Sequence, residues 1–222
     1  MTRPNTSHSL FSDEVSQTPS RKVIATDAWL LRGFAQVDGA VLFAALQPIV
    51  QQAGLRRMLT PGGRRMSVYN TNCGPLGWVS DRRGYRYVAN DPLTDTPWPT
   101  MPDAFATLAD AAARDAGFGA FVPDACLVNI YEPGTRLSLH QDRDERDFDA
   151  PIVSVSLGLP ATFLFGGATR KERPRRVSLL HGDVVVWGGA SRLAFHGVAP
   201  LADGEHPLTG RRRINLTFRK AS

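Results

Sequence analysis

Cysteine, long apolar runs and excess charge are all scarce in this 222-residue sequence. Its two cysteines, Cys73 and Cys126, exclude a disulfide-stabilised scaffold and a cysteine-rich zinc module, and they are typical of a reducing compartment. No segment approaches the roughly 20 apolar residues that span a bilayer. The N-terminal residues contain no apolar stretch of the signal-peptide kind, so we expect a cytoplasmic protein with no membrane partner.

The charge balance is also small. The chain has 26 Lys and Arg against 21 Asp and Glu, a net charge of +5 with a pI near 9.7. This balance permits a polyanionic partner but does not require one. Hydrophobic residues make up 42% of the chain, which excludes a wholly disordered protein and allows one core of the size found in large β-domains.

Hydrophobic periodicity predicts an α+β protein that is mainly β, with two flanking helices. Apolar residues recur at helical spacing from Asp38 to an expected stop at Gly54, and again from Pro102 to about Asp115. Residues 1–20 have no periodicity and predict a flexible tail, followed by a single domain over 21–222. Two early helices before many strands favour one β-sandwich or jelly roll. Strands are predicted at 23–34, 65–72, 124–131, 136–142, 152–158, 161–165, 176–180, 183–187, 193–198 and 212–219.

Arginine and amphipathic aromatic residues gather in segment 56–98. Seven arginines lie between residues 56 and 86, against a single acidic residue, Asp81, and the segment holds three of the four tyrosines. This combination suits stacking on bases and pairing with phosphates. The alternative is a β-hairpin region with a solvated basic face, which is the usual role of a charged run.

The run Ser138-Leu139-His140-Gln141-Asp142 places a histidine and a carboxylate two residues apart. On a β-strand His140 and Asp142 would point to the same side, about 7 Å apart at Cα. They can supply two ligands of a 2-His-1-carboxylate Fe(II) site. Among the other histidines His196 is the best third ligand, because it lies in a strand-like run and Gly197 allows close approach. The alternative is a hydrogen-bonded His–Asp pair and an unrelated core histidine.

The predicted strand at 212–219 has two chemically different faces. The odd positions from Arg213 to Arg219 are polar and share one face, and the even positions are apolar and share the other. Two arginines on a buried face need an anion, and a small dicarboxylate beside the metal would meet both. Asn129 and Tyr131 form a second short polar face. The alternative is an exposed basic edge strand.

Several motifs together carry a more specific signal than His-x-Asp alone. These motifs are residues 60–63, 66–68, 71–78, 123–129, 131–134, 137–142, 151–160, 181–189 and 213–219. Through them the sequence, from about Trp29 to Arg219, resembles the AlkB family of alkylated-nucleic-acid repair dioxygenases, which depend on Fe(II) and 2-oxoglutarate and have a double-stranded β-helix, or jelly-roll, fold.

The resemblance implies a role for each matched residue. His140, Asp142 and His196 would bind Fe(II). Arg213 would face the distal carboxylate of 2-oxoglutarate, and the whole implied cosubstrate site is Asn129, Tyr131, Arg213, Asn215 and Arg219.

Segment 56–98 would be an N-terminal nucleotide-recognition lid. In it Trp78 would stack on the damaged base opposite His140, and Asp144 would approach the exocyclic amine of that base. The implied substrate contacts are Trp78, Tyr85, Tyr87, Asp144 and Arg170.

Two features depart from the family pattern or leave alternatives open. Arg64 stands where the pattern has an aromatic residue and Asn70 where it has methionine, so the lesion preference is open. The loop 170–176 carries five basic residues in seven, and it is either a phosphate contact or a solvated hairpin tip.

The implied activity is oxidative demethylation of N-alkylated bases of the 1-methyladenine and 3-methylcytosine type. Fe(II) is the metal, and 2-oxoglutarate and O2 are cosubstrates that yield succinate, CO2 and formaldehyde. The expected substrates of this monomeric enzyme are alkylated single-stranded or duplex DNA, and RNA. Two alternatives are a 2-oxoglutarate oxygenase acting on protein or a small molecule, and a nucleic-acid-binding module whose metal is structural or absent.

Overall fold

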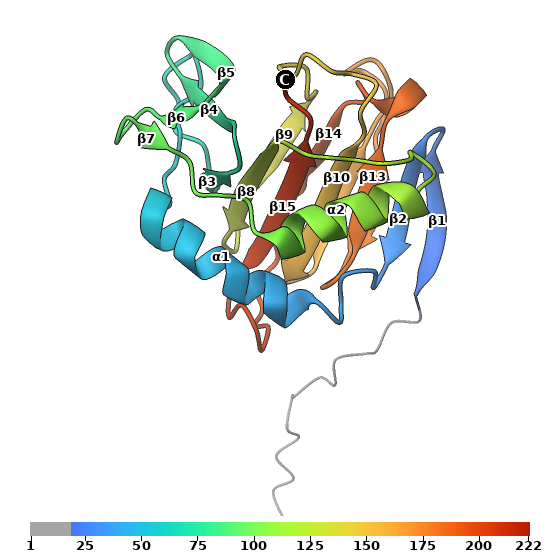
Figure 1. Cartoon of the computed structure of the whole chain (residues 1–222). Helices are drawn as coiled ribbons and strands as arrows, with labels where there is room; N and C mark the ends of the chain where they lie inside the picture. Colours follow the sequence, from blue (N-terminus) through green and yellow to red (C-terminus); the bar gives the residue numbers. More distant parts are fainter. Residues whose placement is uncertain (1–18) are drawn as a thin grey trace, which may run out of the picture.

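The frame of the molecule is a pair of antiparallel β-sheets with two helices against the larger sheet (Figure 1). The structure, a computed structural model, describes residues 19–222, so residues 1–18 of the predicted tail lie outside the described residues. The larger sheet has the strand order β1 (Ser20–Ala25), β2 (Ala28–Arg32), β13 (Val184–Trp187), β10 (Ile152–Gly158), β15 (Arg213–Arg219), β8 (Ala125–Tyr131) and β3 (Tyr69–Cys73). The smaller sheet has the order β12 (Arg175–Leu179), β11 (Ala161–Phe165), β14 (His196–Val198) and β9 (Leu137–His140).

The strand order is that of a jelly roll. From β8 to β15 the chain alternates between the two sheets, apart from the hairpin that joins β11 to β12. The fold class predicted from the sequence is therefore confirmed. Segment 56–98 contributes β3 to the edge of the larger sheet. Its other strands lie beside the frame at one end (Figure 1), as the hairpin of β4 (Gly77–Asp81) and β5 (Gly84–Val88) and the short pair β6 (Asn90–Asp91) and β7 (Thr96–Pro97).

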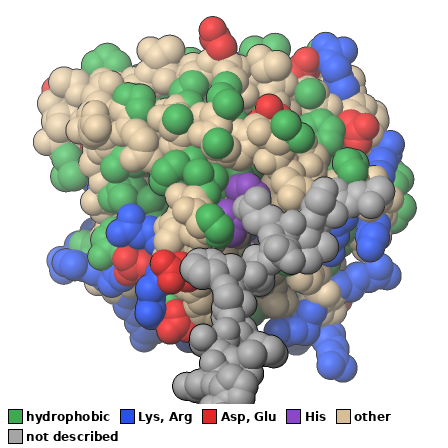
Figure 2. Space-filling view, turned by 90° about the horizontal axis from the view of Figure 1, so that it is seen from below, with side chains coloured by type: hydrophobic (Ala, Val, Ile, Leu, Met, Phe, Trp, Pro, Cys, Tyr) green, Lys and Arg blue, Asp and Glu red, His purple; other side chains and the backbone are tan. Residues whose placement is uncertain are grey.

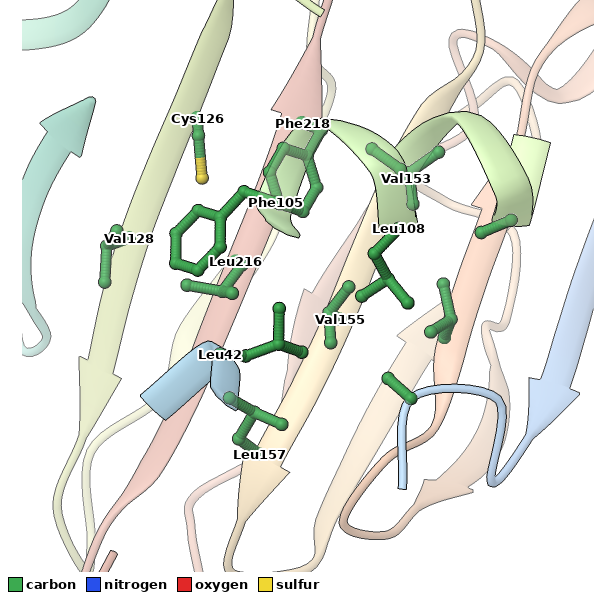
Figure 3. Packing of buried hydrophobic residues seen from close by; sticks show 14 of the residues in the cluster. Leu42, Phe105, Leu108, Cys126, Val128, Val153, Val155, Leu157, Leu216 and Phe218 are labelled. Carbon is green, nitrogen blue, oxygen red and sulfur yellow. The ribbon is translucent and has the colours of Figure 1, made fainter. Parts of the chain in front are cut away.

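The two helices cover the outer face of the larger sheet. They are α1 (Gly39–Ala53), which ends at Gly54 with φ 67°, and α2 (Asp103–Asp115). Figure 3 shows Leu42 of α1 and Phe105 of α2 pointing at the apolar side chains of the central strands. No helix in residues 19–222 is long and apolar enough to cross a membrane.

Charge is unevenly distributed over the surface. In the view from below, most Lys and Arg side chains lie in the lower half of the face, with some Asp and Glu among them, whereas the upper half is mainly hydrophobic and polar surface with scattered Asp and Glu (Figure 2). The face seen in this view therefore has one basic side.

Several predicted strand boundaries are wrong. The strand predicted at 23–34 is two strands, β1 and β2, because the chain turns at Thr26 and Asp27, and Asp27 has a φ of 54°. The carboxylate of Asp27 accepts a hydrogen bond from the amide of Ala190 in the 3₁₀-turn η1 (Gly189–Ser191), a tertiary contact that local propensity does not encode.

The remaining corrections concern where the predicted strands begin and end. The predicted strand 65–72 begins only at Tyr69, and the run 193–198 is a strand only from His196. The strand predicted at 136–142 ends at His140, so Asp142 lies in the following loop.

Leu42→Ala is expected to lower the free energy of unfolding by about 2–5 kcal/mol, because it leaves a cavity between α1 and the sheet. The Leu42 side chain is 1% exposed, whereas its neighbour Val41 is 56% exposed. Val41→Ala is thus the matched control, with an expected change below about 1 kcal/mol. Urea unfolding followed by circular dichroism measures both, and equal losses would contradict the packing of α1 on the sheet.

Candidate metal centre and substrate cavity

A cavity of about 770 Å³ opens between the two sheets and segment 56–98. Its lining includes the polar faces of β8 and β15 from the larger sheet, and of β9 and β14 from the smaller one. His140, Asp142 and His196 all contribute to this lining. The cavity therefore brings together residues that are up to 160 positions apart in the sequence.

The three proposed metal ligands converge at one point. The Nε2 atom of His140 lies 3.6 Å from Asp142 Oδ1, and the Nε2 atom of His196 lies 3.8 Å from Asp142 Oδ2. One ligand atom from each residue lies within 4.8 Å of the other two. His140 and His196 face each other on paired strands, and a Cβ at Gly197 would lie 2.6 Å from the Leu137 carbonyl oxygen. The close approach expected at Gly197 is therefore present.

Both histidines are held in the tautomer that suits a metal. The Nδ1 atom of His140 lies 2.9 Å from the Ser138 carbonyl oxygen, and that of His196 lies 3.0 Å from the Ala194 carbonyl oxygen. A carbonyl can only accept, so Nδ1 carries the proton in each ring and the Nε2 lone pair is free. Burial, with a smaller effect from His140, lowers the pKa of His196 to about 4, so this ring is neutral at pH 7.

Asp142 is kept ionised by Arg219. Burial would raise the pKa of Asp142, but the charge of Arg219, together with the two histidines, holds it well below its usual value. Arg219 donates to Asp142 Oδ2 from Nε at 2.9 Å and from Nη2 at 2.6 Å, which leaves Oδ1 available to a cation. Two imidazoles that carry their proton on Nδ1 and one fixed carboxylate are a ligand set that Fe(II) accepts.

The C-terminal strand β15 faces inward, and the alternative of an exposed edge strand is wrong. Arg213 is 1% exposed, and its Nη2 donates to Ser156 Oγ at 2.9 Å. Its Nε and Nη1 have no hydrogen-bond partner among the described residues. Burial lowers the pKa of Arg213 below its usual value, but an arginine remains charged at neutral pH. Two unpaired donors on a buried cation, beside a cavity, fit the carboxylate of a ligand.

The other polar residues predicted for this side surround Arg213. The ring of Tyr131 lies 4.9 Å from the Arg213 guanidinium carbon, and Asn129 is paired in register with Asn215. All three line the cavity. Arg219 also lines the cavity, but two of its donors bind Asp142, so it contacts a proposed metal ligand and is not wholly available to a cosubstrate.

Trp78 and Tyr85 bring aromatic surface from segment 56–98 to the cavity. Their rings stack with centroids 5.5 Å apart and 12° between planes. The indole nitrogen of Trp78 donates to Asp144 Oδ2 at 2.8 Å. The residue predicted to approach the base is thus already bonded to the residue predicted to stack on it.

Tyr87 lies apart from these substrate candidates. Its hydroxyl donates to Glu145 Oε1 at 2.6 Å, and it is not part of the cavity lining. Burial raises the pKa of Tyr87 well above 10. The structure therefore brings Trp78, Tyr85 and Asp144 together at the cavity, whereas Tyr87 lies outside its lining and contacts Glu145.

Sequence reasoning missed a buried ionic network behind the site. Glu145 is 6% exposed and lies 3.3 Å from Arg219 Nε and 3.3 Å from Arg192 Nη2. Arg192 also donates to the main-chain oxygen of Asp142 at 2.9 Å. The clustered charges of residues 142–147 were the only signal in the sequence, and charged runs are ordinarily surface features.

The loop 170–176 reaches the cavity at one end, through Arg170. Arg170 lines the cavity and donates to the Leu139 carbonyl oxygen. The only acid of the loop, Glu172, is exposed and accepts from Thr169 N at 2.9 Å and Oγ1 at 3.0 Å. The basic side chains are exposed, a placement that both interpretations of this loop allow.

Comparison with known proteins decides the family. Residues 29–219 match the 2OG-Fe(II) oxygenase superfamily. The chain is also 53% identical to the alpha-ketoglutarate-dependent dioxygenase AlkB of Salmonella typhimurium over 96% of this chain and 97% of that protein. The chain belongs to the AlkB family of this superfamily.

Other relatives agree with this assignment. AlkB of Escherichia coli is also 53% identical, over 96% of this chain and 97% of its own length. The tRNA demethylase abh1 of Schizosaccharomyces pombe is 31% identical over 65% of this chain and 52% of its own length. The solved structure of OsALKBH1 superposes with a TM-score of 0.81 at 28% identity, and the match covers 90% of this chain and all of that one.

Membership of the AlkB family makes this chain a 2-oxoglutarate-dependent dioxygenase that uses Fe(II) and O2. The residues present fit these groups. The ionised carboxylate and the two free Nε2 lone pairs suit the metal, and the unpaired donors of Arg213 suit a carboxylate of 2-oxoglutarate.

His140→Gln is expected to weaken Mn(II) binding by more than about 100-fold, since loss of a partner behind a metal ligand alone costs about 10–100-fold. Isothermal titration calorimetry on metal-free protein, with Mn(II) in place of Fe(II), measures the affinity. His206→Gln is the matched control, because His206 lies outside the trio. Mn(II) affinity that is equal in the two variants would contradict a metal site at His140, Asp142 and His196.

Proposed function

We propose that this enzyme oxidatively demethylates N-alkylated bases of the 1-methyladenine and 3-methylcytosine type in DNA, with RNA as a second substrate. The methyl carbon is released as formaldehyde. The reaction is coupled to the conversion of 2-oxoglutarate and O2 to succinate and CO2. One observation carries the proposal. A single cavity is lined by the His–Asp–His trio, by a buried arginine whose Nε and Nη1 have no partner among the described residues, and by the stacked pair Trp78 and Tyr85.

His140, Asp142 and His196 hold the metal in this proposal, and Fe(II) supplies the redox chemistry by which O2 is reduced and the methyl group oxidised. Arg213 binds the distal carboxylate of 2-oxoglutarate through its free Nε and Nη1. Asn129, Tyr131 and Asn215 line the same wall. Arg219 fixes the orientation of Asp142 and neutralises its charge, so that the carboxylate is always ready to coordinate.

Trp78 and Tyr85 form the wall against which the base lies. An alkylated base of this type is cationic, and a cation is attracted both to an aromatic face and to the carboxylate of Asp144. Base and methyl group lie inside a paired duplex, so the nucleotide must leave the stack or already be single-stranded, and the lesion makes this extrusion cheap because it blocks pairing. Arg170 at the cavity mouth is placed to meet the backbone.

A nucleic acid fits this cavity better than a protein or small-molecule substrate does. The stacked aromatic residues Trp78 and Tyr85 belong to the lining, and so do the exposed arginines Arg64, Arg65 and Arg170. The relative in Schizosaccharomyces pombe is a tRNA demethylase. Both single-stranded and duplex nucleic acids are substrates in this proposal. The enzyme acts as a monomer in the cytoplasm, where its two free cysteines stay reduced.

Arg213→Met is expected to weaken binding of 2-oxoglutarate by about 2–4 kcal/mol, because the distal carboxylate loses its charged partner. The affinity is measured by titrating 2-oxoglutarate into the Mn(II)-loaded protein without O2 turnover. Arg212→Met is the matched control, since Arg212 is the exposed neighbour of the buried Arg213. An unchanged affinity in Arg213→Met would place the cosubstrate elsewhere in the cavity.

Trp78→Ala is expected to impair demethylation by about 1–3 kcal/mol, the contribution of stacking one base on an aromatic ring. Slow succinate release without nucleic acid should continue, because Trp78 touches none of the three metal ligands. Trp78→Phe keeps an aromatic face and loses only the hydrogen bond to Asp144, so it should retain most of the activity.

The assays are formaldehyde release from a 3-methylcytosine oligonucleotide and succinate release without it. Equal demethylation by wild type and Trp78→Ala would reject stacking. Joint loss of both activities would mean that Trp78 only supports the fold.

A further inference from the structure

Asn70 presents an unused hydrogen-bond acceptor to the cavity. The residue lies on β3, lines the cavity and is 1% exposed. Its Oδ1 atom is buried and has no hydrogen-bond partner among the described residues. A buried amide oxygen without a donor costs about 1–3 kcal/mol, so a ligand that supplies the donor gains from meeting it.

The orientation of the Asn70 amide follows from a chain of hydrogen bonds that starts at the main chain. Asn215 Nδ2 lies 3.0 Å from the Val155 carbonyl oxygen, which can only accept, so the opposite atom of Asn215 is Oδ1. Asn129 Nδ2 donates to that Oδ1 at 3.4 Å. Asn129 must then offer its own Oδ1 on the other side, and Asn70 Nδ2 donates to it at 2.6 Å.

The strand register keeps this chain of amides in place. Asn70, Asn129 and Asn215 are direct partners across β3, β8 and β15, so their side chains form one row on the cavity face. If the Asn70 amide were turned around, its Oδ1 would lie 2.6 Å from Asn129 Oδ1, and two acceptors at that distance repel each other. The free end of the row, at Asn70, is therefore an oxygen and not an amino group.

The cosubstrate cannot satisfy this oxygen. 2-Oxoglutarate at neutral pH has two carboxylates and a ketone, all of which are acceptors. The donor has to come from the nucleic-acid substrate or from water. Asn70 is also close to Trp78, which with Tyr85 forms the proposed base platform. Asn72, two residues along the same face, accepts from Trp78 N at 3.0 Å and donates to Trp78 O at 3.0 Å.

We propose that Asn70 determines lesion specificity by accepting a hydrogen bond from the exocyclic amino group of the damaged base. The proposal rests on the demethylase function proposed above. Cytosine carries an amino group, a donor, at the position where uracil and thymine carry a carbonyl, an acceptor. Asn70 Oδ1 therefore attracts 3-methylcytosine and repels the carbonyl of 3-methyluracil.

The experiment compares two oligonucleotides that differ only in carrying 3-methylcytosine or 3-methyluracil. Wild type should already prefer 3-methylcytosine, because Trp78 and Asp144 also favour its positive charge, so the test is how the preference changes in variants. In Asn70→Leu, which is similar in size and has no polar atom, kcat/KM should fall for 3-methylcytosine and rise for 3-methyluracil. The ratio should fall about tenfold, as expected for one hydrogen bond of this kind.

The matched control is Thr71→Val. Thr71 is the next residue on β3 and points to the opposite face, and its hydroxyl is likewise buried with no partner in residues 19–222. This variant should leave the ratio unchanged. Fluorescence anisotropy measures the affinity of metal-free protein for each oligonucleotide without turnover. The ratio of the two affinities should change in the variants as the ratio of kcat/KM does.

The outcomes separate the two proposals. Wild type that does not demethylate 3-methylcytosine would end the proposed function. Wild type that demethylates it, with an equal change for both lesions in Asn70→Leu, would overturn the role of Asn70 alone. A raised KM for 2-oxoglutarate with an unchanged lesion ratio would also overturn it, because Asn70 would then act only by supporting the amide row. Opposite changes for the two lesions support it, since a purely structural defect would lower both.

Discussion

The structure depends on the alternation of side chains along β15. This strand lies in the middle of the larger sheet, between β8 and β10. Its even residues, from Ile214 to Phe218, pack under the helices, and its odd residues, from Arg213 to Arg219, face the cavity. A slip of one residue would put two arginines into the apolar layer and three hydrophobic side chains into the cavity. One register thus sets both the core and the site.

The polar face that results is costly by itself. Two guanidinium groups and several amides are taken out of water, and buried charges cost several kcal/mol each unless they are paired. Arg219 is paired with Asp142 and Glu145, whereas Arg213 keeps two donors without a partner among the described residues. The charge that is compensated holds a metal ligand in place, and the charge that is not compensated is the one left for a ligand.

One short loop after β9 connects the metal to the aromatic wall. Asp142 is a proposed metal ligand, Asp144 accepts from the indole of Trp78, and Glu145 accepts from the hydroxyl of Tyr87. Segment 56–98 is therefore attached to the loop that carries a metal ligand. The position of the proposed base platform and the geometry of the metal site are fixed by neighbouring carboxylates, so a change in this loop reaches both.

The sequence by itself determined which residues share a face, because period two is a property of the extended backbone and needs no partner. It therefore predicted the polar faces at 129–131 and 213–219 and the chemistry of His140 and Asp142. Tertiary structure decided where the side chains are paired. In the tertiary structure Asp142 lies in the loop after β9, and Arg219 donates to its carboxylate. Glu145 accepts from the Tyr87 hydroxyl, and Asn70 Oδ1 has no donor among the described residues. These pairings join positions 58–86 residues apart in most cases, and they follow from strand order and register, which local periodicity does not specify.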